Sequence, residues 1–503
     1  MSLKIKDIQK FRGNKLGFFR FKKLGEDFLI TTDIGRYAFL SEKDFGLLVS
    51  GELDKLNKIK KEELESIGII KTSDYEDKMV EGYAKKNHYL NQGPSLHIVV
   101  VTLRCNHKCK YCHAAAAPES AKSSFDMDET TAKKVVDTIF FTTSNAVNIE
   151  FQGGEPLLNF EIVKFITEYA EEKAKILDKR LYLSVVSNLS LMTDEILDYF
   201  VAHDFGVSTS LDGDEELHNL NRTYKPGNSF KETAKWIKKI NKVYKANEDK
   251  LTKAKVGAIL TVTKDTLKKP VEIVDTYISL GLDSVFLRPL NPYGFAASDL
   301  KNLGYSSDDF FDFYRKTMDY IMEVNKKGTY FKEIYSLIFL AKILSEYDPN
   351  FLDVRSPCGA GIGQIAYNYD GNIYTCDEGR MLARMGVDEF KVANLADGGL
   401  ETYKEIINSP ITKALTTAST TDTLPGYDED LYKPFLGVCP IYNYKTEGNI
   451  FPNYSINEKR KIDTQILDYI FENLKNEKNK EVFTNWMYNS NKTNSDGQCL
   501  IFG

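Results

Sequence analysis

Six short runs of apolar, β-branched and aromatic residues recur through the middle of the chain, between residues 96 and 289. They read LHIVVVT (96–102), VNIEFQ (147–152), LYLSVVS (181–187), FGVSTSL (205–211), AKVGAILTVT (254–263) and DSVFLRP (283–289). Such runs are typical of parallel strands covered on both faces. Apolar residues at helical spacing follow the first run, and comparable segments follow the others: Ala132, Val135, Val136, Ile139 and Phe140 are the first set. Six strand and helix units predict an α/β fold, a partial (β/α)6 barrel with its site at the C-terminal strand ends.

The pattern changes on both sides of this barrel. Residues 8–72 alternate aromatic and polar positions and then turn helical, with Ser41 and Asp44 predicting a helix start before Phe45. A second short helix is expected at 60–70, and a linker or connecting helix at 72–91. Beyond Arg288, helices are expected at 308–325, at 331–347 and from Glu458 onward, before a loose polar tail. We therefore expect four parts, at residues 1–90, 91–300, 301–455 and 456–503.

Composition narrows the class of protein. A net charge of -6 with 27% charged residues argues against a nucleic-acid binder, which normally carries a strongly basic surface. The polar start of the chain has no signal-peptide core, and no stretch approaches the roughly 20 apolar residues that span a bilayer. The 7 cysteines, an odd number gathered in motifs, indicate metal ligation in a reducing compartment, and we expect the cytoplasm.

Three cysteines follow the first strand in the string CNHKCKYC: Cys105, Cys109 and Cys112. Three thiolates can hold three corners of a [4Fe–4S] cluster and leave one iron open to another ligand. The alternatives are a zinc knuckle that uses His107 or His113, or a cluster that only stabilises the fold.

With this spacing the chain resembles the radical S-adenosylmethionine (SAM) superfamily. The resemblance implies an enzyme in which the open iron holds the amino and carboxylate groups of SAM. An electron, from a donor such as flavodoxin or ferredoxin, then breaks a C–S bond to give a 5′-deoxyadenosyl radical.

Further strand ends carry residues that suit a SAM pocket. Gly153 and Gly154 let the backbone approach a ligand, and Glu155 can accept a hydrogen bond from an ammonium group, as in the family's GGEP motif. Small polar groups suited to a ribose end the third and fourth strands: Ser187, Asn188, Ser208 and Ser210. Each of these is otherwise an ordinary turn or surface residue.

Two more residues are assigned by the resemblance. Arg222, in HNLNR, matches the arginine that pairs with the SAM carboxylate, for which a planar fork is well suited. Tyr111 matches the aromatic residue near the adenine, and is otherwise a core aromatic.

A second group of cysteines resembles the auxiliary-cluster extension called SPASM or twitch. Cys358, Cys376 and the intervening Gly371 match its opening, but the later run of four cysteines is reduced to Cys439, with Cys499 in the tail. We expect one auxiliary [4Fe–4S] cluster, held by Cys358, Cys376, Cys439 and with Cys499 as a further candidate ligand, or none, with the thiols buried. Asp377 matches the base of sulfatase-maturing relatives and is otherwise a turn residue.

Longer strings resemble one branch, the maturases of His-Xaa-Ser peptide systems. They are FQGGEPLLNF, STSLDG with HNLNR, FLRPLNPYGFA, GIGQIAYNYDGNIY and CDEGRMLARMG, within a likeness over residues 18–449. The branch implies a bacterial cytoplasmic enzyme that acts on a ribosomally made precursor peptide alongside a second maturase. The N-terminal part resembles a winged-helix element that binds leader peptides along a strand edge, and is otherwise an appendage that covers the barrel.

Three hypotheses follow. The first is a radical SAM enzyme that crosslinks or oxidises a precursor peptide. The second is a sulfatase-type maturase that makes formylglycine, favoured by Asp377. The third is a non-catalytic iron–sulfur or peptide-binding scaffold, which would not need Glu155, Arg222 and all three N-terminal cysteines together.

Overall fold

The computed structural model describes residues 15–121, 123–253 and 255–490. Its main feature is a 10-stranded sheet in the order β14-β13-β12-β10-β9-β8-β4-β15-β16-β17. The six predicted strands are confirmed as parallel neighbours within it: β4 (Leu96–Thr102), β8 (Ala146–Gly153), β9 (Arg180–Ser187), β10 (Phe205–Ser210), β12 (Gly257–Thr261) and β13 (Ser284–Arg288). The sheet curls into a partial barrel, so these strands end at one rim.

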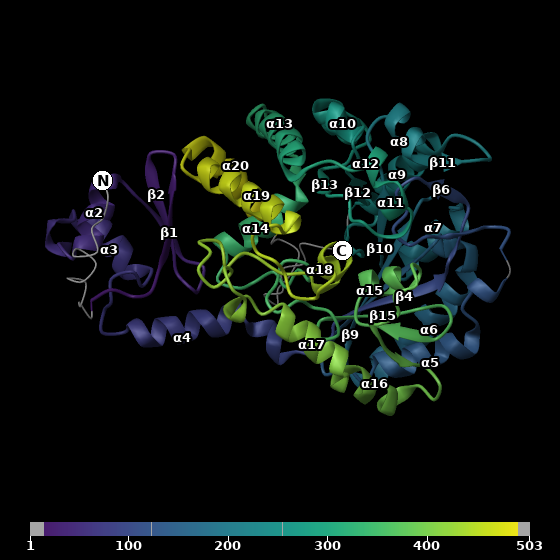
Figure 1. Cartoon of the computed structure of the whole chain (residues 1–503). Helices are drawn as coiled ribbons and strands as arrows, with labels where there is room; N and C mark the ends of the chain where they lie inside the picture. The colour runs from purple at the N-terminus through teal and green to yellow at the C-terminus, as the bar shows by residue number, and fades with distance from the viewer. Residues whose placement is uncertain (1–14, 122, 254, 491–503) are drawn as a thin grey trace.

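Helices cover the outside of this sheet (Figure 1). They are α5 (Glu129–Ile139), α6 (Phe160–Leu177), α7 (Asp194–Ala202), α9 (Ser229–Ala246), α10 (Pro270–Ser279) and α13 (Ser307–Lys326). The apolar face that the spacing predicts for α5 is buried, and Val99 and Phe151 of the sheet are fully buried in the same core. Burial beneath the helices explains why the residues on the outer face of these strands are apolar.

Three strands from the C-terminal half continue the sheet beyond β4. Strand β15 (Gln364–Tyr367) pairs in parallel with β4, and β16 (Asn372–Tyr374) and β17 (Lys391–Asn394) add antiparallel edges. At the other edge, β14 (Lys332–Glu333) pairs with β13. The region with the second cysteine group is therefore joined directly to the barrel wall.

The N-terminal segment forms a small module with an apolar core of its own. It contains an antiparallel sheet of β1 (Arg20–Leu24), β2 (Asp27–Thr31) and β3 (Tyr37–Leu40), with α2 (Glu42–Ser50) and α3 (Lys58–Ser66). Ser41 is the N-cap of α2, as expected, because its hydroxyl accepts from the Asp44 amide at 3.1 Å. Helix α4 (Tyr75–Lys86) runs from this module to the barrel (Figure 1).

Two C-terminal helices, α19 (Glu458–Leu474) and α20 (Glu477–Ser490), lie between the module and the barrel (Figure 1). The rings of Tyr37 and Phe39 pack edge-on against Phe471 of α19, at 5.1 and 6.4 Å between centroids. Helices expected at 308–325, 331–347 and beyond Glu458 are confirmed as α13, α14 (Ile334–Leu344) and α19. The aromatic contacts therefore hold the module against the helical C-terminal part.

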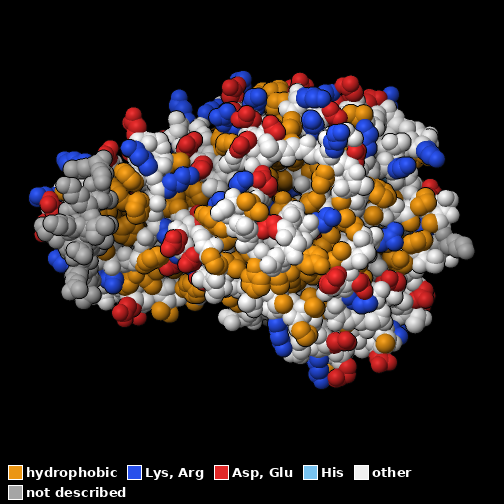
Figure 2. Space-filling model, in the orientation of Figure 1, with side chains coloured by type: hydrophobic (Ala, Val, Ile, Leu, Met, Phe, Trp, Pro, Cys, Tyr) orange, Lys and Arg blue, Asp and Glu red, His pale blue; other side chains and the backbone are white. Residues whose placement is uncertain are grey.

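The remaining elements connect these parts. They are β5 (Arg104–Cys105), β6 (His107–Cys109), β7 (Ala117–Pro118), β11 (Arg222–Tyr224), α8 (Glu215–Asn221), α11 (Gly294–Ser298), α12 (Leu300–Leu303), α15 (Asp377–Ala383), α16 (Gly399–Asn408), α17 (Pro410–Ala418) and α18 (Pro440–Glu447). Figure 2 shows acidic, basic and apolar side chains interspersed over the face in view.

Within the described ranges, none of the helices combines the length and the apolar character that crossing a bilayer requires.

Candidate active site

A cavity of about 1130 Å³ occupies the barrel interior and is lined by residues from the starts of the strands as well as from their C-terminal ends. Most of the residues predicted for the SAM pocket line it: Cys105, Cys109, Tyr111, Cys112, Gly153, Gly154, Ser187, Asn188, Ser208, Ser210 and Arg222. These residues come from the carboxyl ends of β8, β9 and β10, which parallel strands place at one rim, from the loop after β4, and from the start of β11, which pairs with that loop.

The three N-terminal cysteines lie in a loop that is itself partly strand. Strand β6, which contains Cys109, pairs with β11, and this pairing sets Arg222 directly opposite Cys109. Burial raises the pKa of Cys105, and raises that of Cys109 to about 12. Buried thiols of this kind become thiolates when a bound cation compensates their charge.

The cysteine side chains do not converge as they would on one ion. In the described part of the chain, no group of three or more His, Cys, Asp and Glu side chains is arranged to hold a single metal ion. In a cubane cluster each thiolate binds a different iron, so the ligands need not meet at a point. The donor set of three thiols around a cavity thus fits such a cluster.

Gly153 and Gly154 are required by close contact between the end of β8 and the start of the cysteine loop. A Cβ atom on Gly153 would lie 2.0 Å from the Thr102 carbonyl oxygen, and one on Gly154 would lie 2.3 Å from that of Arg104. The Gly154 amide donates to Thr102 at 2.9 Å and the Glu155 amide to Arg104 at 2.8 Å. The glycines therefore fix the loop against the strand end and leave their backbone facing the cavity.

Replacing Gly153 with alanine is expected to lower the free energy of unfolding by roughly 2 kcal/mol or more, because the new methyl group overlaps a backbone oxygen. Chemical denaturation measures this difference. The control is Gly46→Ala in α2, where nothing lies within 4 Å of the added Cβ and a gain of about 0.5–1 kcal/mol is expected. Equal stability of Gly153→Ala and the unaltered protein would contradict the packing argument.

Glu155 is placed differently from its neighbours, since it is 1% exposed and does not line the cavity. Its carboxylate accepts from the Ser187 hydroxyl and the Asn188 amide, both at 2.8 Å, and from the Leu157 amide at 3.1 Å. Glu155 thus ties the end of β8 to the end of β9. Its predicted contact with the amino group of SAM stays a prediction.

Arg222 and Tyr111 form a buried network with Asp212, a residue for which the sequence suggested no role. The Arg222 Nη1 donates to the Tyr111 hydroxyl at 2.8 Å, and that hydroxyl donates to the Asp212 carboxylate at 2.7 Å. Burial raises the pKa of Asp212 to about 6, opposed by the nearby Arg222 charge. The Arg222 Nε is buried without a hydrogen-bond partner among the described residues, which suits an anionic ligand. The network holds the guanidinium beside the cysteine loop.

The second cysteine group is brought together in one apolar cluster. Cys358, Cys376 and Cys439 pack there with Tyr293 and Leu382. Burial raises the pKa of Cys358 to about 12, and it raises the pKa of the other two as well. Three adjoining thiols fit a further cluster and equally fit a buried apolar core. Cys499 lies outside the described residues.

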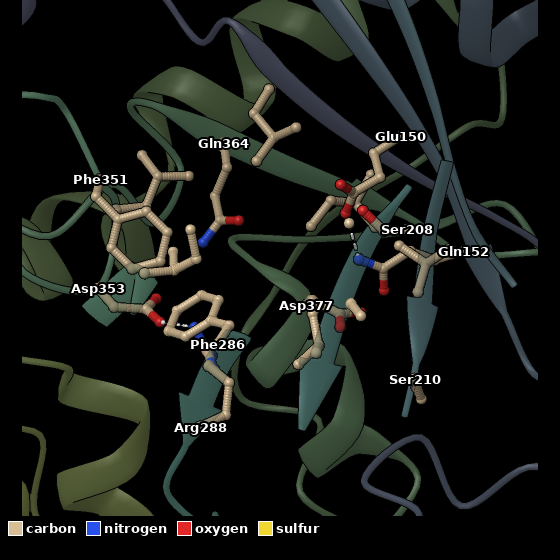
Figure 3. Close-up of a pocket in the computed structure, with 18 of the residues that line it drawn as sticks. Glu150, Gln152, Ser208, Ser210, Phe286, Arg288, Phe351, Asp353, Gln364 and Asp377 are labelled. Carbon is tan, nitrogen blue, oxygen red and sulfur yellow. Dashed lines mark hydrogen bonds and ion pairs between the residues drawn. The ribbon is translucent and has the colours of Figure 1, made fainter. Parts of the chain in front are cut away.

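Asp377 begins α15 and faces the cavity (Figure 3). It is 8% exposed, and its Oδ1 accepts from the Arg380 Nε at 2.7 Å. Other charged and polar side chains that the sequence did not single out surround the same space: Glu150, Gln152, Arg288, Asp353, Gln364 and Glu378. The sequence signal that could have identified Glu150 and Gln152 is the alternation of apolar and polar residues in VNIEFQ. Successive side chains of a strand point to opposite faces, so the polar residues share one face.

Comparison with known proteins agrees with this geometry. Residues 99–277 match the Radical SAM superfamily. An uncharacterized protein of Methanocaldococcus jannaschii is 31% identical over 196 residues, which is 39% of this chain and 62% of that protein. A cysteine-type anaerobic sulfatase-maturating enzyme of Clostridium perfringens is 24% identical over 328 residues, 63% of this chain and 80% of that enzyme.

Two solved structures share the fold. The structure of anSMEcpe with bound AdoMet and a Cp18Cys peptide has a TM-score of 0.61 at 19% identity, and covers 77% of this chain and 100% of its own. Streptococcus suis SuiB bound to its precursor peptide SuiA has a TM-score of 0.50 at 15% identity, with 88% and 99% covered. The partial barrel, its cysteine loop and the sequence match agree that residues 99–277 are a domain of the Radical SAM superfamily.

Proposed function

We propose that this chain is a radical SAM enzyme that modifies a ribosomally made precursor peptide. One observation carries the proposal: the cysteine loop, the glycine turn and the strand-end polar residues border one cavity that continues into the barrel. Its volume of about 1130 Å³ exceeds the roughly 300–1,000 Å³ of ordinary small-molecule sites, which leaves room for part of a peptide beside a cofactor.

The residues around the cavity have distinct tasks in this proposal. A [4Fe–4S] cluster held by Cys105, Cys109 and Cys112, with SAM, supplies a 5′-deoxyadenosyl radical when both are bound. The Arg222 Nε, free of protein partners in the described part of the chain, binds a carboxylate. Ser208 and Ser210 offer hydroxyl groups along β10, and the barrel wall excludes water from the reacting carbon.

Asp377 is the proposed base of the second half-reaction. Hydrogen abstraction leaves a carbon radical on the substrate. Loss of a proton from a neighbouring group and of one electron, which an oxidised iron–sulfur cluster of the enzyme would accept, would then complete the oxidation. The cavity-facing carboxylate takes that proton, while Arg380 keeps it oriented at 2.7 Å.

A peptide is favoured as substrate by the N-terminal module and by the relatives. In the described residues the sheet order β1-β2-β3 leaves β1 and β3 as edge strands, which can pair with an added strand. Two large apolar side chains of this module, Phe18 and Phe21, are 56% and 50% exposed. We therefore propose leader-peptide binding by this module, and membership of the His-Xaa-Ser maturase branch with a second maturase and a flavodoxin or ferredoxin as partners.

The proposed auxiliary cluster predicts the iron content. After anaerobic reconstitution we expect about eight irons per chain, four in the SAM cluster and four held through Cys358, Cys376 and Cys439. Cys358→Ala should lower this to about four. An unaltered protein that stops at about four irons would show that the second cysteine group is an apolar core.

The proposed function is tested with a short precursor peptide sought among the neighbouring genes, incubated anaerobically with reductant, SAM and the reconstituted protein. Tandem mass spectrometry should find a loss of two hydrogens per crosslink at a defined residue. An aldehyde at Cys or Ser would instead support formylglycine formation, the second candidate, which the sulfatase-maturating relative and Asp377 favour. Peptide binding without 5′-deoxyadenosine would identify a scaffold and contradict the proposal.

A further inference from the structure

The middle of the cavity has a polar wall that the SAM pocket does not use. Asn148, Glu150 and Gln152 occupy alternate positions on β8 and all line the cavity. Figure 3 shows Glu150 and Gln152 directed into the same space as Asp377 and Gln364, which come from α15 and β15.

Glu150 is a carboxylate without an ion pair in the part of the chain that the structure describes. Its Oε1 accepts from the Gln152 amide at 2.6 Å. Burial raises the pKa of Glu150, and the nearby charge of Asp377 raises it further. A buried carboxylate without a compensating cation is costly, and a cationic ligand would remove that cost.

Among the described residues, none of the cations that line the cavity forms an ion pair with Glu150. Arg288 pairs with Asp353 at 3.1 Å, and Arg380 pairs with Asp377 at 2.7 Å while its Nη1 has no hydrogen-bond partner among the described residues. Arg222 belongs to the Tyr111 network at the cysteine loop. The lysines lie at the opposite end, near the starts of β12 and β13, where Lys332 pairs in register with Ser284. The space before Glu150 thus favours positive charge.

Gln364 provides a second and independent indication of a ligand. It is 6% exposed, its side chain points into the cavity (Figure 3), and its amide has no hydrogen-bond partner among the described residues. Gln364 pairs in register with Leu96 of β4, and Leu96 pairs in register with Asn148 of β8. Gln364 therefore lies level with Asn148, two residues along β8 from Glu150. An amide both donates and accepts, which matches a peptide group.

We propose that Glu150 and Gln364 form a subsite for a residue of the substrate peptide that has a basic side chain. The Glu150 carboxylate accepts a hydrogen bond from the cationic nitrogen of that side chain. The Gln364 amide forms hydrogen bonds with the backbone of the same substrate residue. This inference rests on the proposed function, since it names the kind of residue that the cavity admits.

Binding of two tripeptides by the reconstituted protein with SAM tests the subsite. The probes are acetyl-Gly-Lys-Gly-amide and the same peptide with norleucine, which has nearly the shape of lysine but no charge. Calorimetry at low salt should show the lysine peptide binding about tenfold more tightly, as a charge-assisted hydrogen bond predicts. Glu150→Gln, which keeps an acceptor for Gln152, should abolish this preference. Gln364→Leu should weaken both peptides alike.

The matched control is Glu172→Gln, an exposed glutamate on α6 outside the cavity, which should keep the preference. Equal or undetectable binding of the two peptides by the unaltered protein would overturn the inference, even if Glu150→Gln fails to fold. A preference that survives in a folded Glu150→Gln would also overturn it. Failure of the proposed function is seen separately, as absence of 5′-deoxyadenosine, and a charge preference in such a protein would still support the subsite.

Discussion

Replacing Cys105 with alanine is expected to reduce 5′-deoxyadenosine formation by about 1,000-fold or more, to the level of the uncatalysed background. Cys105 lines the cavity in the loop between β4 and β6, the strand that pairs with β11. Without Cys105, only two thiols of this loop remain to hold the four irons of the cluster. Iron content should fall by about four per chain. Anaerobic turnover with dithionite, followed by chromatography, measures the product.

The matched control for Cys105 is Lys108→Ala in the same loop, where the side chain is exposed and no thiol is lost. That variant should release 5′-deoxyadenosine at the rate of the unaltered protein. If Cys105→Ala retained both iron and turnover, the cysteine loop would not hold the reactive cluster.

Replacing Asp377 with asparagine is expected to slow peptide modification by about 100-fold or more, as loss of a general base does. Release of 5′-deoxyadenosine should continue, because Asp377 lies across the cavity and not in the cysteine loop. The two products, quantified in one reaction, show this uncoupling. The asparagine amide has nearly the same shape as the carboxylate and keeps a hydrogen-bond acceptor for Arg380, so folding should be preserved.

Asp397→Asn serves as the control for the second prediction, since Asp397 is exposed and lies outside the cavity. It should leave both products unchanged. Asp377→Asn that modifies the peptide at the normal rate would show that the base lies elsewhere. A joint loss of modification and 5′-deoxyadenosine would show that Asp377 serves the cofactor site.

The barrel could be predicted because its signal is local. Strand β4 is apolar nearly throughout, β8 alternates apolar residues on its outer face with polar residues toward the cavity, and α5 has its buried residues at helical spacing. The rule that parallel strands end at one rim then brings the cysteine loop, Gly153 and Ser208 together, as the cavity confirms for these positions.

The features that were not predicted depend on contacts distant in sequence. Pairing of β15 with β4 joins residues more than 250 positions apart, and it alone brings Gln364 into the cavity. Asp212 acquires its role through Tyr111 and Arg222, and Glu155 through the end of β9. Sequence patterns indicate which face of a strand is apolar. They do not indicate which carboxylate, distant in sequence, accepts a hydrogen bond from a buried hydroxyl.

The central claim is that Cys105, Cys109 and Cys112 hold a cluster that cleaves SAM reductively. The most direct measurement is the yield of 5′-deoxyadenosine and methionine from the anaerobically reconstituted protein, reduced with dithionite and supplied with SAM. We expect both products in equal amounts, with or without peptide. A protein with a fully loaded, reduced cluster that releases neither product would contradict the account.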